Sequence, residues 1–188
     1  LKNINELELL EFIKCIFSIY ANKNKKKYYE FGEKLTNKII NIVNPWSTPY
    51  IADIFCSFIE NYERFQKEYA YLGMKTLIEK NSLQIKISMP KLIPIISYDI
   101  NDSGTNVRKY SSEVLEQLLN CSGNADLDKF TSVVMNGLKH PEKTYSCVEE
   151  LASCVFVQNV EAPALAITVP IILRGLRDKN TATKRLTC

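Results

Sequence analysis

The residues of this chain best suited to catalysis or metal binding are one histidine and six cysteines. Acid–base or metal chemistry needs such a histidine beside carboxylates or cysteines, but His140 stands directly before Pro141 in a predicted turn. The cysteines form no C-x-x-C pair, and most lie in amphipathic stretches where a thiol serves as a small buried apolar group. We therefore expect no catalytic residue and no metal ligand in this segment, and a reduced, cytoplasmic setting.

Motifs that bind nucleotides or carry out hydrolysis are also absent from the sequence. It contains no G-x-x-x-x-G-K-[ST] loop, G-x-G-x-x-G fingerprint, G-x-S-x-G elbow or H-E-x-x-H pair, and its six glycines are scattered singly. We expect that the segment itself is not an enzyme, holds no cofactor and takes no small-molecule ligand.

Basic residues gather in two clusters, which are the remaining candidates for a functional site. The net charge is only +3, from 24 basic and 21 acidic residues, so an electrostatic function depends on local clustering. The candidate contacts to RNA or the ribosome are Lys23, Lys25, Lys26, Lys27, Arg174, Arg177, Lys179, Lys184 and Arg185. Both clusters fall at predicted turns between paired helices, on one edge of the fold. The alternative is a solvated surface, because Asp99 and Asp102 interrupt any continuous basic stripe.

Helices must position these clusters, because apolar residues recur at helical spacing along almost the whole chain. Examples are Leu9, Ile13, Ile16 and Phe17; Ile51, Ile54, Phe55 and Phe58; and Leu127, Phe130, Val134 and Leu138. Each such stretch predicts a helix of about three to four turns. The polar breaks between them are short, so neighbouring helices are expected to run antiparallel.

The helix pairs repeat with a period of 38 residues. Steps of 38 connect Phe31, Tyr69, Val107 and Tyr145, and residues 169–172 (VPII) repeat residues 93–96 (IPII) after 76 positions, or twice 38. This period lies at the lower edge of the HEAT and armadillo range. The sequence predicts an all-α solenoid of about five helix pairs, the last one truncated, with repeats at roughly 1–44, 45–81, 82–121, 122–157 and 158–188.

Acidic and basic residues at equivalent turns suggest a structural ladder between repeats. Asp102 precedes the second helix of its pair, Arg108 follows six positions later, and Asp178 matches Asp102 in the period. We expect the aspartates to cap or bridge the turn within a repeat, and the arginine to pair with a neighbouring repeat's aspartate. The ladder is imperfect, because the equivalent positions carry His140 and Arg64.

Several stretches resemble one known family. They are residues 156–165 (FVQNVEAPAL), 169–176 (VPIILRGL) and 183–185 (TKR), with support from residues 89–94 (MPKLIP), 127–130 (LDKF) and 65–68 (FQKE). From about residue 45 onward the chain resembles the N-terminal HEAT domain of fungal-type translation elongation factor 3, a ribosome-associated ATPase of the ABC-F class.

This resemblance implies a role in translation elongation. In that family the HEAT domain lies against the ribosome, and distant ATPase cassettes drive release of deacylated tRNA from the exit site. The expected partners are therefore the ribosome, through rRNA and ribosomal proteins, and other domains of a longer parent chain. The resemblance implies ATP and Mg²⁺ for that parent and no hydrolysis by this segment.

A generic protein-interaction solenoid is the alternative function, of the kind found in translational-control activators and in transport or phosphatase scaffolds. Repeat proteins bind through broad surfaces that leave no short motif, so the sequence does not decide between the two. No membrane partner is expected, because the longest apolar run, residues 162–173, is interrupted by Pro163, Thr168 and Pro170 and is too short to span a bilayer.

Overall fold

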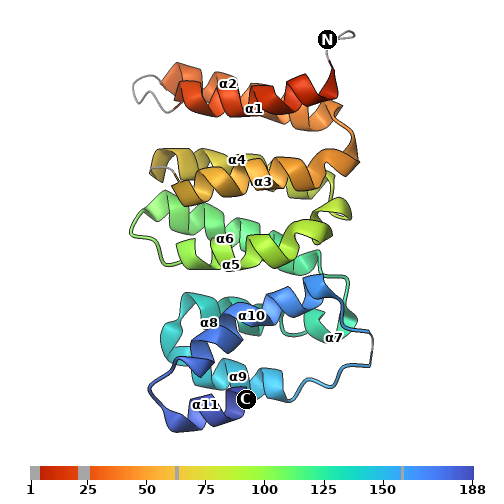
Figure 1. Cartoon of the computed structure of the whole chain (residues 1–188). Coiled ribbons are helices and arrows are strands. Elements are labelled where there is room, and N and C mark those ends of the chain that lie inside the picture. The colour runs from red at the N-terminus through yellow and green to blue at the C-terminus, as the bar shows by residue number, and fades with distance from the viewer. Residues whose placement is uncertain (1–4, 21–25, 62–63, 158) are drawn as a thin grey trace. The chain divides into compact units, whose positions relative to one another are not determined.

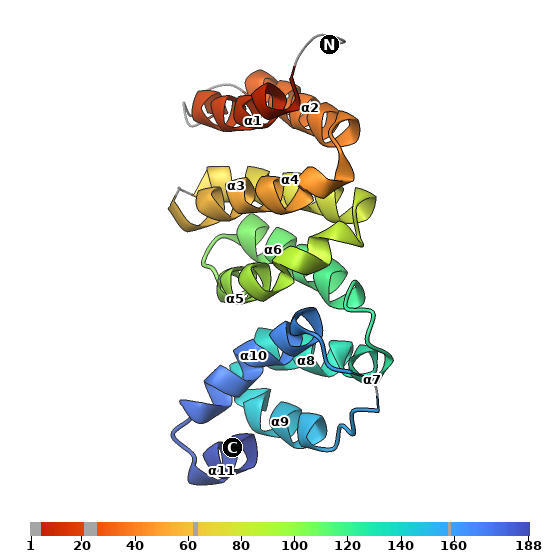
Figure 2. The same cartoon turned by 45° about the vertical axis from the view of Figure 1, so that its right-hand side comes forward.

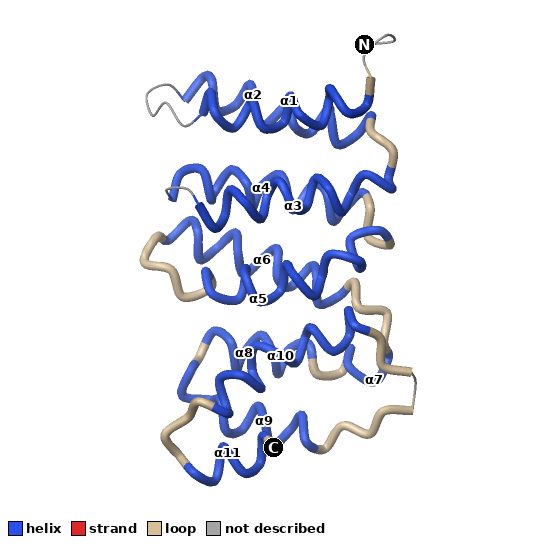
Figure 3. The backbone as a smooth tube through the Cα atoms, in the orientation of Figure 1, coloured by secondary structure: helices blue, strands red, loops and turns tan. Residues whose placement is uncertain are grey.

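The computed structural model describes residues 5–20, 26–61, 64–157 and 159–188, and within these ranges it consists of helices and connecting loops with no strand (Figure 3). The prediction of an all-α fold is therefore confirmed. The chain divides into two compact units, residues 1–85 and residues 86–188. None of the helices in the described ranges is long and apolar enough to cross a membrane.

The first unit contains two helix pairs (Figure 1). The helices are α1 (Glu6–Tyr20), α2 (Lys26–Ile42), α3 (Thr48–Asn61) and α4 (Arg64–Lys80), with the 3-10 turn η1 (Pro45–Ser47) before α3. α1 packs on α2, α3 packs on α4, and α2 also contacts α4. A short break precedes α3 because Asn44 caps η1, its side chain accepting a hydrogen bond from the Trp46 amide at 3.0 Å.

Aromatic rings fill the core of the first unit. Phe17 of α1 stacks on Phe58 of α3, with ring centroids 3.9 Å apart, and meets the edge of Tyr69 of α4 at 4.7 Å. The Tyr69 hydroxyl is buried and shares a hydrogen bond of 2.8 Å with the Thr36 hydroxyl of α2. This polar end is therefore satisfied inside the core, and helices from both pairs contribute to one apolar interior.

The second unit contains the remaining helices. They are α5 (Met89–Asp99), α6 (Thr105–Asn120), α7 (Ala125–Asp128), α8 (Thr131–Lys139), α9 (Thr144–Ala152), α10 (Ala162–Leu176) and α11 (Thr181–Thr187). The 3-10 turns η2 (Gln84–Ser88) and η3 (Pro141–Lys143) precede α5 and α9. Successive helices pack as pairs, namely α5 on α6, α8 on α9 and α10 on α11.

α10 occupies the centre of this unit. It packs against α5 as extensively as α5 packs against α6, and it also contacts α8, α9 and α11 (Figure 2). These neighbours bury Ala164, Ala166, Ile167 and Ile171 of α10, whereas Leu165, Ile172, Leu173 and Leu176 remain exposed on its other side. The matching motifs at residues 93–96 and 169–172, which the 38-residue period separates by two repeats, therefore belong to helices in direct contact.

One predicted helix is divided in the structure. The pattern through Leu127, Phe130 and Leu138 predicts a single helix, but α7 ends at Asp128 and α8 begins at Thr131. Phe130 has φ −99° and ψ 0°, and its amide donates to the Leu127 carbonyl at 2.8 Å, which closes a tight turn in place of a helical hydrogen bond. The expectation of one continuous helix is wrong here because this turn ends α7 after four residues.

The predicted repeat intervals remain predictions. The first three contain the pairs α1–α2, α3–α4 and α5–α6, the fourth contains α7, α8 and α9, and the fifth contains α10 and α11. The register positions Phe31, Tyr69, Val107 and Tyr145 lie in α2, α4, α6 and α9. Phe31 and Tyr145 are exposed whereas Tyr69 and Val107 are buried, so equivalent positions in the period do not share one environment.

Candidate nucleic-acid interface

A groove of about 540 Å³ opens on the edge of the second unit where its helix pairs turn. Its walls come from α5, α10, the end of α8 and the turns that follow α8 and α10. The lining residues are Pro94, Ser97, Tyr98, Leu138, Pro141, Thr144, Pro170, Leu173, Arg174, Arg177, Asp178 and Lys179. Figure 1 shows the turns that follow α8 and α10 on the same side of the second unit, at the left of the view.

Two of the predicted basic residues supply free positive charge to this groove. Arg177 and Lys179 lie in the turn between α10 and α11, and both are exposed. In the part of the chain that the structure describes, no hydrogen bond or ion pair occupies either side chain. Asp178 stands between them, but its carboxylate accepts a hydrogen bond from the Asn180 amide at 2.8 Å within the turn.

Arg174 also lines the groove, but its guanidinium is engaged. It donates to the carbonyls of Gly137 and, at 3.4 Å, Leu138, both in the last turn of α8. The last carbonyls of a helix have no partner within the helix, so a cation there satisfies them and interacts favourably with the helix dipole. Burial lowers the pKa of Arg174 from its usual value, although the side chain stays charged. Its observed contacts join α10 to α8.

The remaining basic candidates fall into two groups. Lys184 and Arg185 are exposed on α11 and do not line it. Lys23 and Lys25 lie outside the described residues, and Lys26 and Lys27 begin α2 with side chains that are likewise not described. The structure therefore brings together Arg174, Arg177 and Lys179 from the predicted set.

The residues predicted to be structural, Asp102, Arg108 and Asp178, lie at or near the turns within the helix pairs α5–α6 and α10–α11. The Asp102 carboxylate accepts a hydrogen bond from the Gly104 amide at 2.6 Å, just before α6, and Arg108 donates to the Asp102 backbone carbonyl at 2.7 Å. Asp102 and Asp178 thus form equivalent local turns, each accepting from the amide two residues later. This contact of Arg108 is within its own repeat, and a ladder between neighbouring repeats stays a prediction.

Tyr98 is the groove residue that the sequence reasoning missed. Its side chain is 83% exposed, although it belongs to a helix whose apolar residues Leu92, Ile93 and Ile96 are fully buried. A signal was present in the sequence, because Tyr98 lies two residues after Ile96 and therefore on the opposite face of α5.

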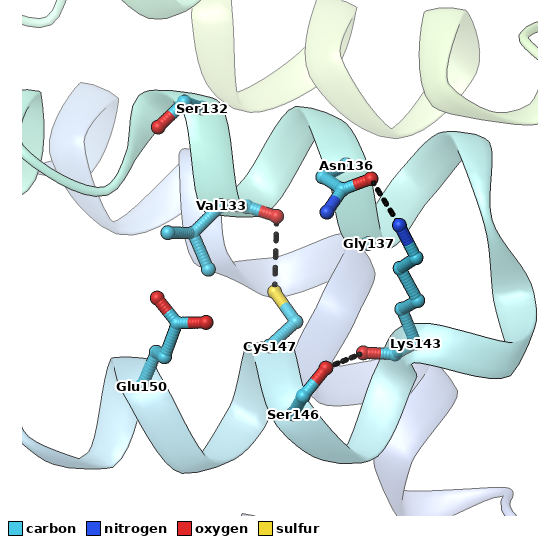
Figure 4. Close-up of a pocket in the computed structure, with 8 residues that line it drawn as sticks. All are labelled: Ser132, Val133, Asn136, Gly137, Lys143, Ser146, Cys147 and Glu150. Carbon is cyan, nitrogen blue, oxygen red and sulfur yellow. Dashed lines mark hydrogen bonds between the residues drawn. The ribbon is translucent and has the colours of Figure 1, made fainter.

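A second pocket, of about 360 Å³, lies between α8 and α9 and contains a thiol (Figure 4). Cys147 is only 3% exposed and donates to the Val133 carbonyl at 3.4 Å. Burial, with a smaller contribution from Glu150, raises its pKa to about 11. A thiol that keeps its proton is a poor nucleophile, so Cys147 acts here as a buried apolar group.

The arrangement of the other cysteines supports the same conclusion. None of the six cysteines, all of which the structure describes, forms a disulfide, and burial also raises the pKa of Cys121 and Cys154. His140 is exposed at the end of α8 beside Glu142, 3.4 Å from its carboxylate. Among the residues that the structure describes, no group of three His, Cys, Asp or Glu side chains is placed to hold a metal ion.

Comparison with known proteins identifies the type of helical repeat. A family described as "Elongation factor 3/GNC1 HEAT repeat" matches residues 142–188, which include α9, α10 and α11. Elongation factor 3 of Pneumocystis carinii is 30% identical over 148 residues, covering 78% of this chain and 14% of the relative. Elongation factor 3 of Phytophthora infestans is 27% identical over 181 residues, covering 96% of the chain and 17% of the relative.

A third relative agrees with these two. Elongation factor 3A of Saccharomyces cerevisiae is 24% identical over 178 residues, covering 94% of the chain and 17% of the relative. The chain thus spans only about a sixth of the length of the curated relatives it matches. The matched region is a helical repeat and has no catalytic fold. The family match, the similarity to these relatives and the helix pairs of both units together show that the chain is an elongation factor 3-like HEAT-repeat segment of the α-solenoid class.

Proposed function

We propose that this segment is a non-catalytic scaffold that contacts the ribosome, both rRNA and ribosomal proteins. The observation that carries the proposal is the groove on the turn edge of the second unit, where Arg177 and Lys179 offer free cations beside the exposed ring of Tyr98. Arginine and lysine on an open edge release counterions when they meet phosphates, which favours binding to RNA. The likeness to elongation factor 3 supports a partner in translation.

The proposal extends to the longer parent chain of which this segment would be a part. In that parent, ATPase cassettes outside the segment would bind ATP and Mg²⁺ and drive release of tRNA from the exit site in the cytoplasm. The segment would contribute affinity and orientation, through its turn edge and through contacts with other domains of the parent. The lysine run, Lys23, Lys25, Lys26 and Lys27, and the α11 residues Lys184 and Arg185 are further candidate RNA contacts.

Cosedimentation of the chain with purified ribosomes at increasing salt tests this proposal. Binding at low salt should weaken as salt rises, because each phosphate contact contributes to the salt dependence. The double variant Arg177→Glu/Lys179→Glu should lose most of the bound fraction. A matched control, Lys38→Glu/Lys129→Glu, makes the same charge change at exposed positions outside the groove and should bind as the unaltered chain does.

The result that would overturn the proposal is no cosedimentation at low salt. Equal loss of binding in the groove variant and in the control would also contradict it, because it would reduce the effect to net charge. ATP hydrolysis by the purified chain would contradict its non-catalytic role.

A protein-interaction scaffold is a second candidate, which one observation favours. Val155 and Val157, in the loop between α9 and α10, are 77% and 84% exposed, and Phe156 between them is half-exposed. Three adjacent exposed apolar residues are a feature of protein-binding surfaces. Binding to ribosomes that persists at high salt and is lost on substituting Val155 and Val157 by serine would favour this candidate over RNA contact.

A further inference from the structure

The turn-edge groove combines a flat aromatic surface with anion-binding side chains, a combination that phosphate binding alone does not require. Tyr98 exposes most of its ring at the rim, and Pro94, Pro141 and Pro170 add apolar rings to the walls. Its volume of about 540 Å³ is within the range of sites that enclose a small ligand or part of a larger one. The groove therefore has room for a planar group as well as for a charged one.

The charges in this groove are available to a ligand with negative charge. Arg177 and Lys179 flank Asp178, whose carboxylate is turned to the amide of Asn180. Arg174 is held by the carbonyls of α8 and so fixes α10, which carries the basic turn at its end. The cations lie in the turn directly after α10 and the aromatic ring belongs to α5, and these two helices pack directly against each other.

We propose that this groove binds an unpaired nucleotide of single-stranded RNA, its base stacked on Tyr98 and its flanking phosphates on Arg177 and Lys179. The inference rests on the proposed function and specifies it, because it states which RNA feature the segment takes. Sequence-tolerant binding of single strands commonly combines base stacking on aromatic rings with a cationic path for the backbone.

Two other occupants fit the observations less well. A paired RNA duplex offers phosphates, but its bases are stacked inside the helix and leave no face for the exposed ring. An acidic peptide would complement Arg177 and Lys179, yet its carboxylates would gain little from a flat ring that is 83% exposed. An unpaired nucleotide uses both features, since it carries a planar base and a charged phosphate within one residue.

Fluorescence anisotropy with a labelled ten-nucleotide uridine oligomer tests the inference. Tyr98→Ala should weaken binding about 5-fold to 100-fold, the loss expected for one stacked base, whereas Tyr98→Phe should stay within about 2-fold. Arg177→Ala/Lys179→Ala should reduce the slope of log affinity against log salt by about 1.4, or about 0.7 for each phosphate contact with a single strand. Circular dichroism should be unchanged, because Tyr98 is exposed.

The controls separate this inference from the proposed function. Trp46→Ala removes another aromatic side chain, 73% exposed but outside the groove, and should not change oligomer binding. The inference is overturned if Tyr98→Ala binds the oligomer as the unaltered chain does, if a paired duplex of the same length binds with the same dependence on Tyr98, or if a ten-residue glutamate peptide displaces the oligomer at equal concentration. Ribosome cosedimentation that persists in any of these cases leaves the proposed function standing, whereas its absence in the unaltered chain refutes that function separately.

Discussion

Replacing Gly137 by alanine should destabilise the second unit, although glycine is normally the weaker helix former. Gly137 lies in α8 where α9 and α10 approach, and a Cβ at this position would stand 2.8 Å from Cys147 Sγ, 2.9 Å from Cys147 Cβ and 3.1 Å from Ile171 Cδ1. Real Cβ atoms essentially never come within 3.0 Å of such neighbours, and both residues are buried. The helices would therefore have to move apart.

The expected magnitude follows from two opposing effects. Alanine in a helix interior gains about 1 kcal/mol over glycine from backbone entropy. Forcing an extra methyl group into a packed core costs about 1–3 kcal/mol. Because Cys147 is anchored by its own helix and cannot rotate its Cβ away, we expect the cost to exceed the gain, with a net loss of about 1–2 kcal/mol in the free energy of unfolding.

Urea unfolding monitored by circular dichroism measures this loss. With a slope of about 2 kcal/mol per molar urea, the midpoint should fall by roughly 0.5–1 M. Ser132→Ala, an exposed change in the same helix, provides the control for propensity and should be neutral or slightly stabilising. Cys147→Ala should relieve part of the effect of Gly137→Ala, since it removes the sulfur but leaves the Cβ. A Gly137→Ala chain that is more stable than the original would refute the close approach of the three helices.

Three further predictions concern the same unit. Arg174→Ala should cost about 1–3 kcal/mol of stability by leaving the end of α8 without its charged donor, and Arg174→Lys should recover part of it, measured by urea unfolding. Asp102→Ala should cost about 1 kcal/mol, and Asp102→Asn less, because the Asx turn to the Gly104 amide needs only a side-chain carbonyl oxygen. The pKa of Cys147 in the folded chain is about 11, above the ordinary 9.0. The contribution of Cys147 to the free energy of unfolding is therefore fully present below pH 9 and should be lost as the pH rises towards 11. This loss in the free energy of unfolding is about 3 kcal/mol at most. In the Cys147→Ala variant, stability should decrease less between about pH 9 and about pH 11. An equally steep decline in that variant would contradict the prediction.

Local features of this chain could be predicted from sequence with more success than distant ones. An Asx turn depends on a few adjacent residues, and the Asp102 and Asp178 carboxylates each accept a hydrogen bond from the amide two positions later. The antiparallel pairs likewise follow from helical periodicity and short connections. These features depend on interactions within a few turns of chain.

The packing of α10 on α5 could not be predicted in the same way. The 38-residue period relates residues 93–96 to residues 169–172 as similar motifs, but it does not state which helices touch. The short α7, the nine-residue helices α8 and α9, and the loop after α9 allow α10 to reach α5. The loop is held by a hydrogen bond of 2.8 Å from the Val157 amide to Asp126 of α7, a contact between residues 31 positions apart.

The candidate site also combines features that are visible in the sequence with features that depend on tertiary packing. Arg177 and Lys179 are candidates from sequence because they cluster along the chain, and their role in binding stays a prediction. The contact of Arg174 with α8 depends on packing and could not be predicted. Periodicity alone does not separate the exposed Tyr98 from Tyr69 and Tyr71, which are fully buried. Which aromatic residue remains exposed is decided by the tertiary contacts.

Photo-cross-linking from position 98 tests the central claim most directly. A benzoylphenylalanine placed at Tyr98 keeps an aromatic side chain at the groove and forms covalent bonds only with molecules in contact with it. With purified ribosomes we predict a cross-link to rRNA that disappears in the Arg177→Glu/Lys179→Glu background, and none from the same group at Glu116, an exposed residue of α6. Absence of any ribosomal cross-link at position 98, while the chain remains bound to ribosomes, would contradict the claim that this edge makes the contact.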